Sequence, residues 1–520
     1  MISDKLYASL ERYWIWIYAI ATGLLGLWLL HHHYQIISAT FPLDYYEGTA
    51  VMITGLMADG NNPYTFEFQP QAMYVYSPLY NMLVAPMTWI FDNTLQLHRL
   101  VSAVFILTSC LICASAVYRC GQSWRHSMAA AVLLYAALLF YGTPVASTNA
   151  LGVCLYLLIL YLPWRHDFST ASLAWACVLA VLAFYAKQYF ILAMALLCLY
   201  MFLYESRKRA LMLGVCYASL LLTSVWWVDY TSPYYLDNTF FSPMIAADRL
   251  QNSAIAILQY TEFLRLYWPL LIISVLCGRA LAGKPASSYP STRFFWFCLL
   301  CAALVLAFSL ARNPGNYMTY LFQLLTPALL IGCFGLLSRQ QSDIKALAPL
   351  VLICFYQAYA LLPKDFSTTE ENWQRVDQLI SENDQMLTSQ MLVATLLKHG
   401  KAVEQDGHTF YFPLAADKSP IFIKEDPTLR VDAIWHNYIS SIYRKIEAQQ
   451  YDLIMVTSWD FRGIFVNNPP PFSDLDGKTF LKQYYAVDET LPLSMTERHG
   501  GGTWPVRIWR PKQPDTRSER

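Results

Sequence analysis

Repeated apolar blocks constrain the fold of this chain more than any other feature of its sequence. Between about Trp14 and Leu362 the apolar residues gather in successive blocks of roughly 16–24 residues, the length that an α-helix needs to cross the hydrocarbon core of a membrane. Of the 520 residues, 56% are hydrophobic and only 14% are charged, too apolar for an ordinary soluble globule. After Pro363 the blocks stop. The sequence therefore predicts a polytopic α-helical membrane domain over residues 1–362 and a soluble domain over residues 363–520.

About eleven of these blocks are long enough to be spanning helices. They lie at approximately residues 14–38, 97–118, 126–142, 149–164, 171–186, 189–204, 210–228, 263–278, 294–311, 317–337 and 345–362. Lys and Arg in short loops stay on the cytoplasmic side. With the N-terminus in the cytoplasm, nearly every basic cluster falls on that side: Arg119 and Arg125, Arg165, Arg207 to Arg209, Arg279 and Lys284, Arg293, Arg339 and Lys345. An odd number of spans then places residues 363–520 outside, in the periplasm if the cell is Gram-negative.

This count requires that the apolar stretch Met73–Phe91 does not cross the membrane. Its length alone allows a crossing, which would reverse the orientation of every later span. The distribution of basic residues decides against a crossing. We therefore expect interfacial helices in this first outer loop, with Tyr and Trp side chains at the depth that aromatic rings prefer.

The overall charge and the metal-type residues exclude other classes of partner. The numbers of basic and acidic residues are equal, 36 each, whereas nucleic-acid binding requires concentrated positive charge. The twelve cysteines lie in or beside the apolar blocks without zinc-type spacing. His31, His32 and His33 follow one another on a helix and point in different directions. We therefore expect no nucleic-acid partner, buried cysteines, and interfacial histidines rather than a metal cluster.

Two carboxylates follow the first predicted span, in the segment FPLDYYEG at residues 41–48. Asp44 and Glu47 are three residues apart, so they could share one face of a helix. A carboxylate held at the membrane surface can act as a general base toward a hydroxyl group. The simpler interpretation is that these acids only cap a helix at the interface, and the residues alone leave both interpretations open.

Two cations break the charge rule because they fall at outer helix junctions. Lys187 lies in YAKQY at residues 185–189, and Arg312 lies in ARNPGNY at residues 311–317. Charged residues at membrane depth usually face a protein interior or an aqueous cavity. Such a pair can clamp a lipid-linked phosphate or diphosphate. The alternative is that both side chains reach to lipid headgroups.

These features, in this order, resemble the GT-C class of membrane glycosyltransferases, and more narrowly bacterial members related to the aminoarabinose and protein mannosyl transferases. The resemblance covers roughly residues 14–362. The matching pieces are DYYEG at residues 44–48, the turn GNNPY at 60–64, YSPLY at 76–80, Lys187-Gln188, and Asn316-Tyr317 at the start of a later span. Taken singly, GNNPY and YSPLY are each explained by turn formation at their Gly and Pro residues.

The resemblance implies a bacterial inner-membrane enzyme that takes a sugar from a polyprenyl-phosphate donor and places it on a lipid, glycan or protein acceptor at the outer face. Asp44 would be the catalytic base, with Glu47 assisting it or positioning the acceptor. Lys187 and Arg312 would hold the donor phosphate. The expected substrate-binding residues are Tyr46, Tyr64, Tyr76, Asn149, Gln188, Asn316 and Tyr317. No cofactor is expected, although some relatives use a divalent metal ion.

The chain departs from the family pattern in the second outer loop. Many relatives carry an acidic residue where this chain reads TPVASTN, residues 143–149, and the neutral amide of Asn149 cannot act as a base. A second acid would then come from the long outer loop, where the candidates are Asp229, Asp237 and Asp248.

The sequence after Lys364 predicts a small α/β domain. Helical patterns cover residues 385–399 and 437–448, and strand patterns cover residues 451–457 and 504–509. Loops are expected at Asn467–Pro471 and Gly500–Gly502. No catalytic motif stands out there, so acceptor recognition and coverage of the membrane cavity both stay open as roles.

Two other function classes compete with the enzyme. A transporter or flippase of lipid-linked glycans predicts inverted repeats and helices broken near the bilayer midplane. We find no internal repeat, and the acids and cations gather at one face, which favours surface chemistry. A non-catalytic assembly protein would have a very similar sequence, and only an assay separates it from the enzyme.

Overall fold

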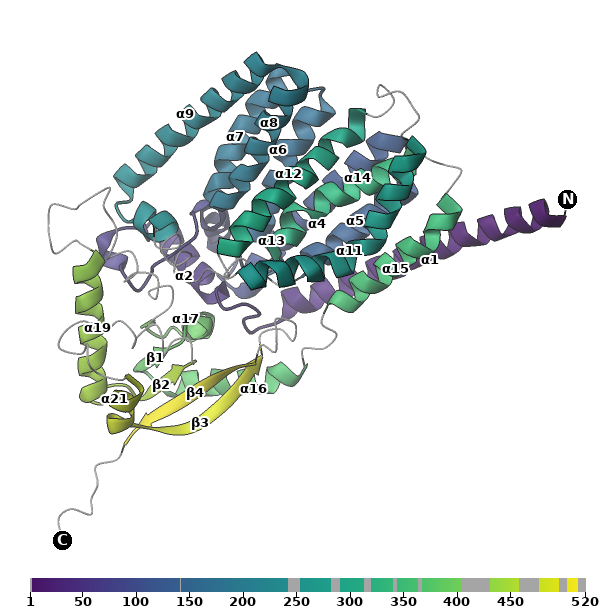
Figure 1. Ribbon diagram of the computed structural model, residues 1–520. Helices are drawn as coiled ribbons and strands as arrows, with labels where there is room; N and C mark the ends of the chain where they lie inside the picture. The colour runs from purple at the N-terminus through teal and green to yellow at the C-terminus, as the bar shows by residue number, and fades with distance from the viewer. Residues whose placement is uncertain are drawn as a thin grey trace, which may run out of the picture. The chain divides into compact units, whose positions relative to one another are not determined.

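The computed structural model describes residues 2–140, 142–241, 253–281, 290–312, 319–339, 344–362, 367–404, 431–457, 477–494 and 503–512. The chain is mostly helical, with one four-stranded sheet near its C-terminus (Figure 1). It divides into two compact units. The first unit contains Met1–Ser38, Arg99–Val225 and Leu250–Leu362, and the second contains Ala39–His98, Trp226–Arg249 and Pro363–Arg520. The second unit thus includes two outer loops besides the C-terminal segment, and a division into consecutive domains at residue 362 stays a prediction.

Every block predicted to span the membrane contains at least one helix among its described residues. The helices are α1 (Ile2–Ser38), α4 (Leu95–Gly121), α5 (Trp124–Leu138), α6 (Asn149–Arg165), α7 (Thr170–Ala186), η3 (Gln188–Ile191), α8 (Leu192–Tyr200), η4 (Met201–Glu205), α9 (Arg207–Thr231), α11 (Ser253–Leu281), α12 (Pro290–Arg312), α13 (Thr319–Leu324), α14 (Thr326–Arg339) and α15 (Ile344–Leu361). Among the residues described, three helical stretches are both long and apolar enough to span a membrane: Leu95–Gly121, Gln188–Glu205 and Arg207–Thr231. Shorter apolar helices include Asn149–Arg165 and Thr170–Ala186.

Small residues let the helices of the first unit approach one another closely. Helix α6 packs against α7 and α8, and α8 packs against α12 (Figure 1). A Cβ atom at Gly152 would lie only 1.8 Å from the ring of Phe190, and one at Gly332 would lie 2.9 Å from the ring of Trp296. Glycine at such contacts is typical of helices that associate through van der Waals packing in a membrane. This packing fixes the α7–η3 junction, where Lys187 lies, against α6.

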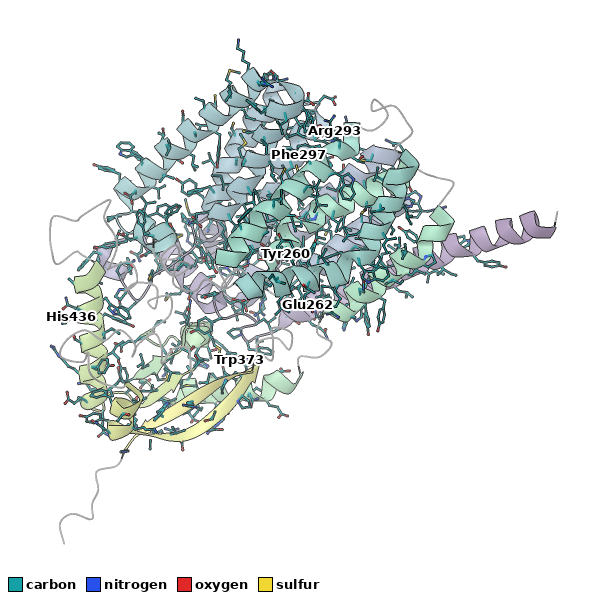
Figure 2. The ribbon with its side chains drawn as sticks, viewed as in Figure 1. Tyr260, Glu262, Arg293, Phe297, Trp373 and His436 are labelled. Carbon is teal, nitrogen blue, oxygen red and sulfur yellow. The ribbon has the colours of Figure 1, made fainter. Side chains whose placement is uncertain are left out.

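An aromatic contact holds η4, which follows α8, against α12. Arg293 and Phe297 lie one turn apart on α12 (Figure 2). The Arg293 guanidinium lies 3.8 Å from the ring centroid of Tyr204, and the Phe297 ring meets the same tyrosine edge-on at 5.7 Å. A cation over an aromatic face is favourable, more so when the pair is partly desolvated.

The three adjacent histidines of α1 do not act as one group. His33 Nδ1 lies 2.8 Å from the hydroxyl oxygen of Tyr135, and the ring of His32 stacks on Trp28. These side chains therefore point to different partners, as successive positions on a helix require.

The sheet of the second unit is mixed and has the strand order β1-β2-β4-β3 (Figure 1). Its strands are β1 (Met386–Thr388), β2 (Leu453–Val456), β3 (Tyr485–Ser494) and β4 (Thr503–Pro511), and its helices are α16 (Ser367–Glu382), η7 (Gln390–Leu392), α17 (Val393–Lys398), α19 (Val431–Glu447) and α21 (Gly477–Tyr484). Strand β1 is parallel to β2, and the other pairs are antiparallel. The predicted strands at residues 451–457 and 504–509 and the helix at 437–448 are confirmed.

The helix expected over Gln385–His399 is wrong in its first part. Met386–Thr388 forms strand β1, and only Val393–Lys398 forms an α-helix after one turn of η7. The apolar residues of this stretch fit both the helical period of about 3.6 residues and the strand period of about 2. Pairing with β2 gives the strand its hydrogen-bond partners. The expected loops at Asn467–Pro471 and Gly500–Gly502 lie outside the described residues.

The first outer loop forms short helices, namely α2 (Glu47–Ala58), η1 (Phe66–Phe68), α3 (Leu79–Val84) and η2 (Ala85–Trp89). Within the stretch Met73–Phe91, α3 and η2 together contain eleven residues, six and five, far fewer than the about 20 that a spanning helix needs. Helix α2 ends in a Schellman motif, in which Gly60 adopts a φ of 79° and its N–H donates to Met57 O. The predicted turn at residues 60–64 therefore begins as the C-terminal cap of α2.

Both outer loops join the core of the C-terminal segment. Met73 from the first outer loop and Tyr234 from the long outer loop belong to one buried cluster with side chains of α19 and of the sheet, including Trp435, Ile442 and Trp509. The Tyr234 N–H donates to Tyr64 O at 3.1 Å. The second unit is therefore one hydrophobic core assembled from three separate parts of the chain.

An ion cluster ties α16 to the end of α17. Asp377 Oδ1 lies 2.7 Å from Lys398 Nζ and 3.0 Å from His399 Nε2. Burial by itself would raise the pKa of the Asp377 carboxyl, but hydrogen bonds and charges from Lys398 and His399 outweigh it and hold the pKa below its ordinary value of 3.8. A carboxyl with a lowered folded-state pKa stabilises the fold above its unfolded-state pKa, and this contribution is lost as the pH falls through the folded-state value.

We therefore expect Asp377→Asn to lower the stability of the second unit at pH 7 by about 1 kcal/mol or less, as for other solvent-exposed ion pairs. The difference in Tm between wild type and variant should become smaller when the pH is lowered from 7 to about 2, because the wild-type carboxyl gains a proton as the pH falls through its lowered pKa. Thermal unfolding in detergent at both pH values measures this. Glu371→Gln, an exposed acid on the same helix, is the control. An equal Tm difference at both pH values would contradict the assignment.

Candidate functional site

Asp44 lies in a tight turn that connects the end of α1 to α2. The Tyr46 N–H donates to Asp44 Oδ1 at 3.0 Å, and the Glu47 N–H donates to Asp44 O at 3.3 Å. Glu47 is the first residue of α2, and its carboxylate accepts a hydrogen bond from the Leu43 N–H at 2.6 Å. Each of the two carboxylates thus accepts a backbone N–H of the turn, which holds the turn closed.

The structure corrects the expectation that Asp44 and Glu47 share one face of a helix. Helix α2 begins at Glu47, so Asp44 lies one turn before it. Hydrogen bonding of the Asp44 side chain to a nearby backbone N–H favours a turn over a helix. Asp44 remains 8% exposed, whereas Glu47 is fully buried. Their environments therefore differ, and of the two acids Asp44 is the one that solvent can reach.

Aromatic side chains surround this turn within the second unit. The half-buried rings of Tyr46 and Tyr76 meet edge-on with centroids 6.0 Å apart. Tyr64 is buried, and its hydroxyl donates to Tyr76 O at 2.7 Å. Burial raises the pKa of the Tyr64 hydroxyl well above its ordinary value, so Tyr64 stays a neutral hydrogen-bond donor. Tyr64 thus supports Tyr76, which in turn lies against Tyr46 beside the Asp44 turn.

The long outer loop is hydrogen-bonded to the first outer loop. Asn62 Nδ2 donates to Ser232 Oγ at 2.8 Å, and Ser77 Oγ lies 3.1 Å from the hydroxyl oxygen of Tyr235. Of the three candidates for a second acid, Asp229 lies in the last turn of α9 and Asp237 at the start of η5 (Asp237–Phe241), and both are half-buried. Asp248 lies outside the described residues.

Lys187 lies where α7 ends and η3 begins, in the first unit. Its backbone is extended, with φ −161° and ψ 132°, so α7 and η3 are not one continuous helix. Although a lysine, it is only 8% exposed. Its ammonium donates to Asn149 Oδ1 at 3.1 Å and lies 5.3 Å and 5.2 Å from the ring centroids of Tyr189 and Tyr320. An amide oxygen and two aromatic faces together stabilise a buried cation.

This cluster contains residues that sequence reasoning missed. The Tyr189 hydroxyl donates to Gln323 Oε1, and Gln323 Nε2 donates to Thr143 Oγ1 at 2.9 Å. With Tyr320, these residues form a polar group beside Lys187. Gln323 is fully buried. A polar side chain inside the apolar block 317–337 is energetically unfavourable at membrane depth, so its presence there was the sequence signal that could have identified this residue.

The neutral residue at position 149 has a role other than that of a base. Asn149 is the first residue of α6, and its Nδ2 donates to Gly142 O at 2.6 Å while its Oδ1 accepts from Lys187. The amide is therefore held in one orientation, with its oxygen directed at the ammonium. Gln188, the residue after Lys187, begins η3 and is half-buried.

The remaining predicted residues lie at or beyond the edge of the described structure. Arg312 is the last residue of α12. Asn316 and Tyr317 lie outside the described residues. The Asp44 and Lys187 clusters belong to different units. Among the residues that the structure describes, no group of three His, Cys, Asp or Glu side chains could hold a metal ion.

Comparisons with known proteins identify the fold. No protein-family model matches the chain. No curated protein matches its sequence. Among solved structures, ArnT from Cupriavidus metallidurans bound to undecaprenyl phosphate is similar over 95% of this chain and 98% of ArnT, with a TM-score of 0.58 and 12% identity. The chain has the GT-C fold.

Two further similar structures have lower scores than the first. Apo ArnT of the same organism has a TM-score of 0.43 at 10% identity, over 96% of this chain and 98% of ArnT. The Archaeoglobus fulgidus oligosaccharyltransferase, tethered to an acceptor peptide, has a TM-score of 0.46 at 9% identity, over 92% of this chain and 72% of that chain. The GT-C assignment therefore rests on the TM-score of 0.58, and at 12% identity it concerns the fold alone.

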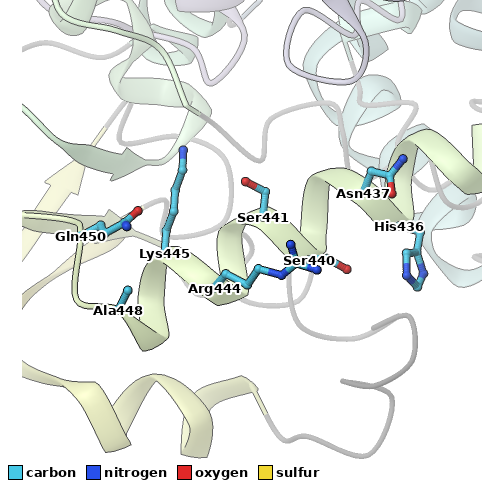
Figure 3. A pocket seen from close by; sticks show the side chains of 8 residues that line it. All are labelled: His436, Asn437, Ser440, Ser441, Arg444, Lys445, Ala448 and Gln450. Carbon is cyan, nitrogen blue, oxygen red and sulfur yellow. The ribbon is translucent and has the colours of Figure 1, made fainter.

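A pocket lies along one face of α19 (Figure 3). Its volume is 560 Å³, and it is lined by His436, Asn437, Ser440, Ser441, Arg444, Lys445, Ala448 and Gln450. Lys445 Nζ is already paired with Glu404 at 2.8 Å. The lining residues supply hydroxyl, amide, imidazole, guanidinium and ammonium groups, and no carboxylate is among them.

Proposed function

We propose that this protein is an integral membrane glycosyltransferase that moves a sugar from a polyprenyl-phosphate donor to a lipid, glycan or protein acceptor. The observation that carries the proposal is the buried ammonium of Lys187 at the α7–η3 junction, in a chain with the GT-C fold. The ArnT structure of that fold holds undecaprenyl phosphate. A desolvated cation supported by Asn149, Tyr189 and Tyr320 suits a phosphate that is linked to a lipid.

The proposed enzyme lies in the bacterial inner membrane and crosses it about eleven times. Its N-terminus is in the cytoplasm and residues 363–520 are outside. The distribution of Lys and Arg between the loops supports this orientation. Transfer then takes place at the outer face, where the Asp44 segment and the α7–η3 junction are both expected.

In the proposed reaction, the Asp44 carboxylate takes the proton of an acceptor hydroxyl as that oxygen attacks the anomeric carbon of the donor sugar. The bond between this carbon and the phosphate oxygen breaks, and polyprenyl phosphate leaves with the bonding electrons. Lys187 and Arg312 stabilise the charge of the leaving phosphate. Glu47 positions the Asp44 turn through the Leu43 N–H.

The remaining site residues are proposed to bind the substrates. Tyr46 and Tyr76 offer aromatic faces to a sugar, and Tyr64 holds Tyr76 in place. Asn149 and Gln188 lie at the Lys187 junction and would contact the donor phosphate. Asn316 and Tyr317, from the segment after α12, complete the set.

The test uses purified full-length protein in lipid, with a panel of radiolabelled polyprenyl-phosphate sugars and a membrane extract as the source of acceptors. We expect label from one donor to appear in an acceptor and polyprenyl phosphate to be released in equal amount. Movement of intact labelled donor across the bilayer without cleavage would favour a transporter. Transfer from none of the donors, by protein that is folded, would contradict the proposal.

A further inference from the structure

The chain on the C-terminal side of the Asp44 turn is packed against the C-terminal segment. Gly48, in the first turn of α2, faces η7 and α17. A Cβ atom at this position would lie 2.8 Å from Ala394 N, 3.0 Å from Val393 Cβ and 3.1 Å from Gln390 O. Two of these three atoms belong to the backbone, which cannot move aside as the end of a flexible side chain can. The contact therefore fits glycine and no larger residue.

A buried hydrogen bond lies next to this contact. Gln390 Nε2 donates to Thr49 Oγ1, and both residues are fully buried. A buried amide donor that loses its acceptor is left without a hydrogen bond and without water, which destabilises the fold. The bond therefore selects one position of α2 relative to η7.

The chain on the N-terminal side of the turn is held by a different helix of the same segment. The ring of Phe41 stacks on Trp373 of α16, with ring centroids 6.0 Å apart and planes within 10° of each other. Phe41 is 7% exposed and Trp373 is 3% exposed. Figure 2 labels Trp373 beside the sheet. The turn from Pro42 to Glu47 is thus bounded by contacts with residues more than 300 positions later in the chain.

The elements that contact the turn, η7 and α16, are themselves bonded to the sheet and to α17. The Ser389 N–H, just before η7, donates to Met455 O of β2 at 2.8 Å. Asp377 of α16 binds Lys398 and His399 at the end of α17. A shift of η7 or of α16 would therefore disturb the sheet and the ion cluster, so these elements form a firm support for the turn.

From this arrangement we propose that α16, η7 and α17 act as the positioning element for Asp44. Trp373 holds the chain before the turn, Gln390 and Ala394 hold it after the turn, and the Glu47–Leu43 bond keeps the turn rigid between them. Thr49 and Gln390 are positioning residues that act through Asp44. The expected effect on kcat rests on the proposed function. The structural coupling of the Asp44 turn to α16, η7 and α17 does not depend on that function.

The first test compares Thr49→Val with Thr49→Ser in the full-length protein in lipid. Valine has nearly the same shape as threonine but lacks the hydroxyl that accepts from Gln390, whereas serine keeps it. Hydrogen exchange of the peptides that cover residues 41–58 is expected to be faster in Thr49→Val and unchanged in Thr49→Ser. Exchange in α6 and α7 is expected to be the same in all three proteins.

The same variants are assayed for sugar transfer. We expect Thr49→Val to lower kcat about tenfold to a hundredfold with an unchanged KM for the polyprenyl-phosphate donor, because small misplacements of a catalytic group cost up to about 10²-fold. Thr49→Ser should restore kcat. Unchanged exchange together with unchanged kcat in Thr49→Val would overturn the inference. A wild type that transfers no sugar would overturn only the proposed function, because the exchange data still test the coupling.

A second pair of variants covers the case in which Thr49→Val does not fold. Gly48→Ala introduces the Cβ atom that meets Ala394 N, and Gly214→Ala adds the same methyl group at a helical position with open space around it. Faster exchange over residues 41–58 and lower kcat are expected only in Gly48→Ala. Equal behaviour of the two alanine variants would overturn the inference.

Discussion

The Asp44→Asn variant is expected to transfer sugar with a kcat about 10²- to 10⁴-fold below that of wild type, the range that general-base catalysis contributes. Asparagine has the same shape as aspartate and keeps an oxygen that accepts the Tyr46 N–H, a bond of 3.0 Å in the native turn. The turn should therefore persist while the basic group is lost. Initial rates at saturating donor, compared at matched Tm, measure the effect.

Two further variants separate chemistry from structure. Asp59→Asn removes an exposed acid at the opposite end of α2 and should leave kcat unchanged. Glu47→Gln keeps an oxygen that can accept from the Leu43 N–H, so it should lower kcat far less than Asp44→Asn. Should Glu47→Gln abolish transfer while Asp44→Asn retains it, Glu47 is the base and the assignment of Asp44 is wrong.

The second large effect is expected at Lys187. Lys187→Gln removes the ammonium but keeps a polar side chain of similar length near Asn149. A hydrogen bond to a charged group contributes about 2 kcal/mol, which corresponds to a roughly 30-fold higher KM for the donor. The loss of kcat should be smaller if the cation binds the phosphate equally in the ground state and the transition state. Steady-state kinetics with varied polyprenyl-phosphate sugar measure both constants.

Matched variants define what this result means. Lys208→Gln removes an exposed lysine at the start of α9 and should change neither constant. Lys187→Arg keeps the charge over the rings of Tyr189 and Tyr320 and should retain part of the donor affinity. An unchanged KM in Lys187→Gln, with the Tm of wild type, would show that Lys187 does not bind the donor.

The amino-acid sequence by itself determined the helical blocks and several elements of the C-terminal sheet. Hydrophobicity over about 20 residues is a local property, and a helix satisfies its own backbone groups, so no distant partner is needed to predict one. Local apolar patterns also predicted β2, β4 and α19, although a strand, unlike a helix, needs a partner strand for its backbone hydrogen bonds. The sequence also marked the turn at residues 60–64 through Gly60, since only a residue that tolerates positive φ completes the cap.

The tertiary structure alone decided what surrounds each candidate residue. Glu47 is fully buried because its carboxylate turns back to Leu43, and a spacing of three residues does not reveal that. Lys187 is joined through Tyr189 to Gln323, which is 134 residues away from that tyrosine in the sequence. Likewise, Met386–Thr388 became a strand because β2 pairs with it. Such contacts form between parts of the chain that no local pattern connects, because burial and hydrogen-bond satisfaction are properties of the whole core.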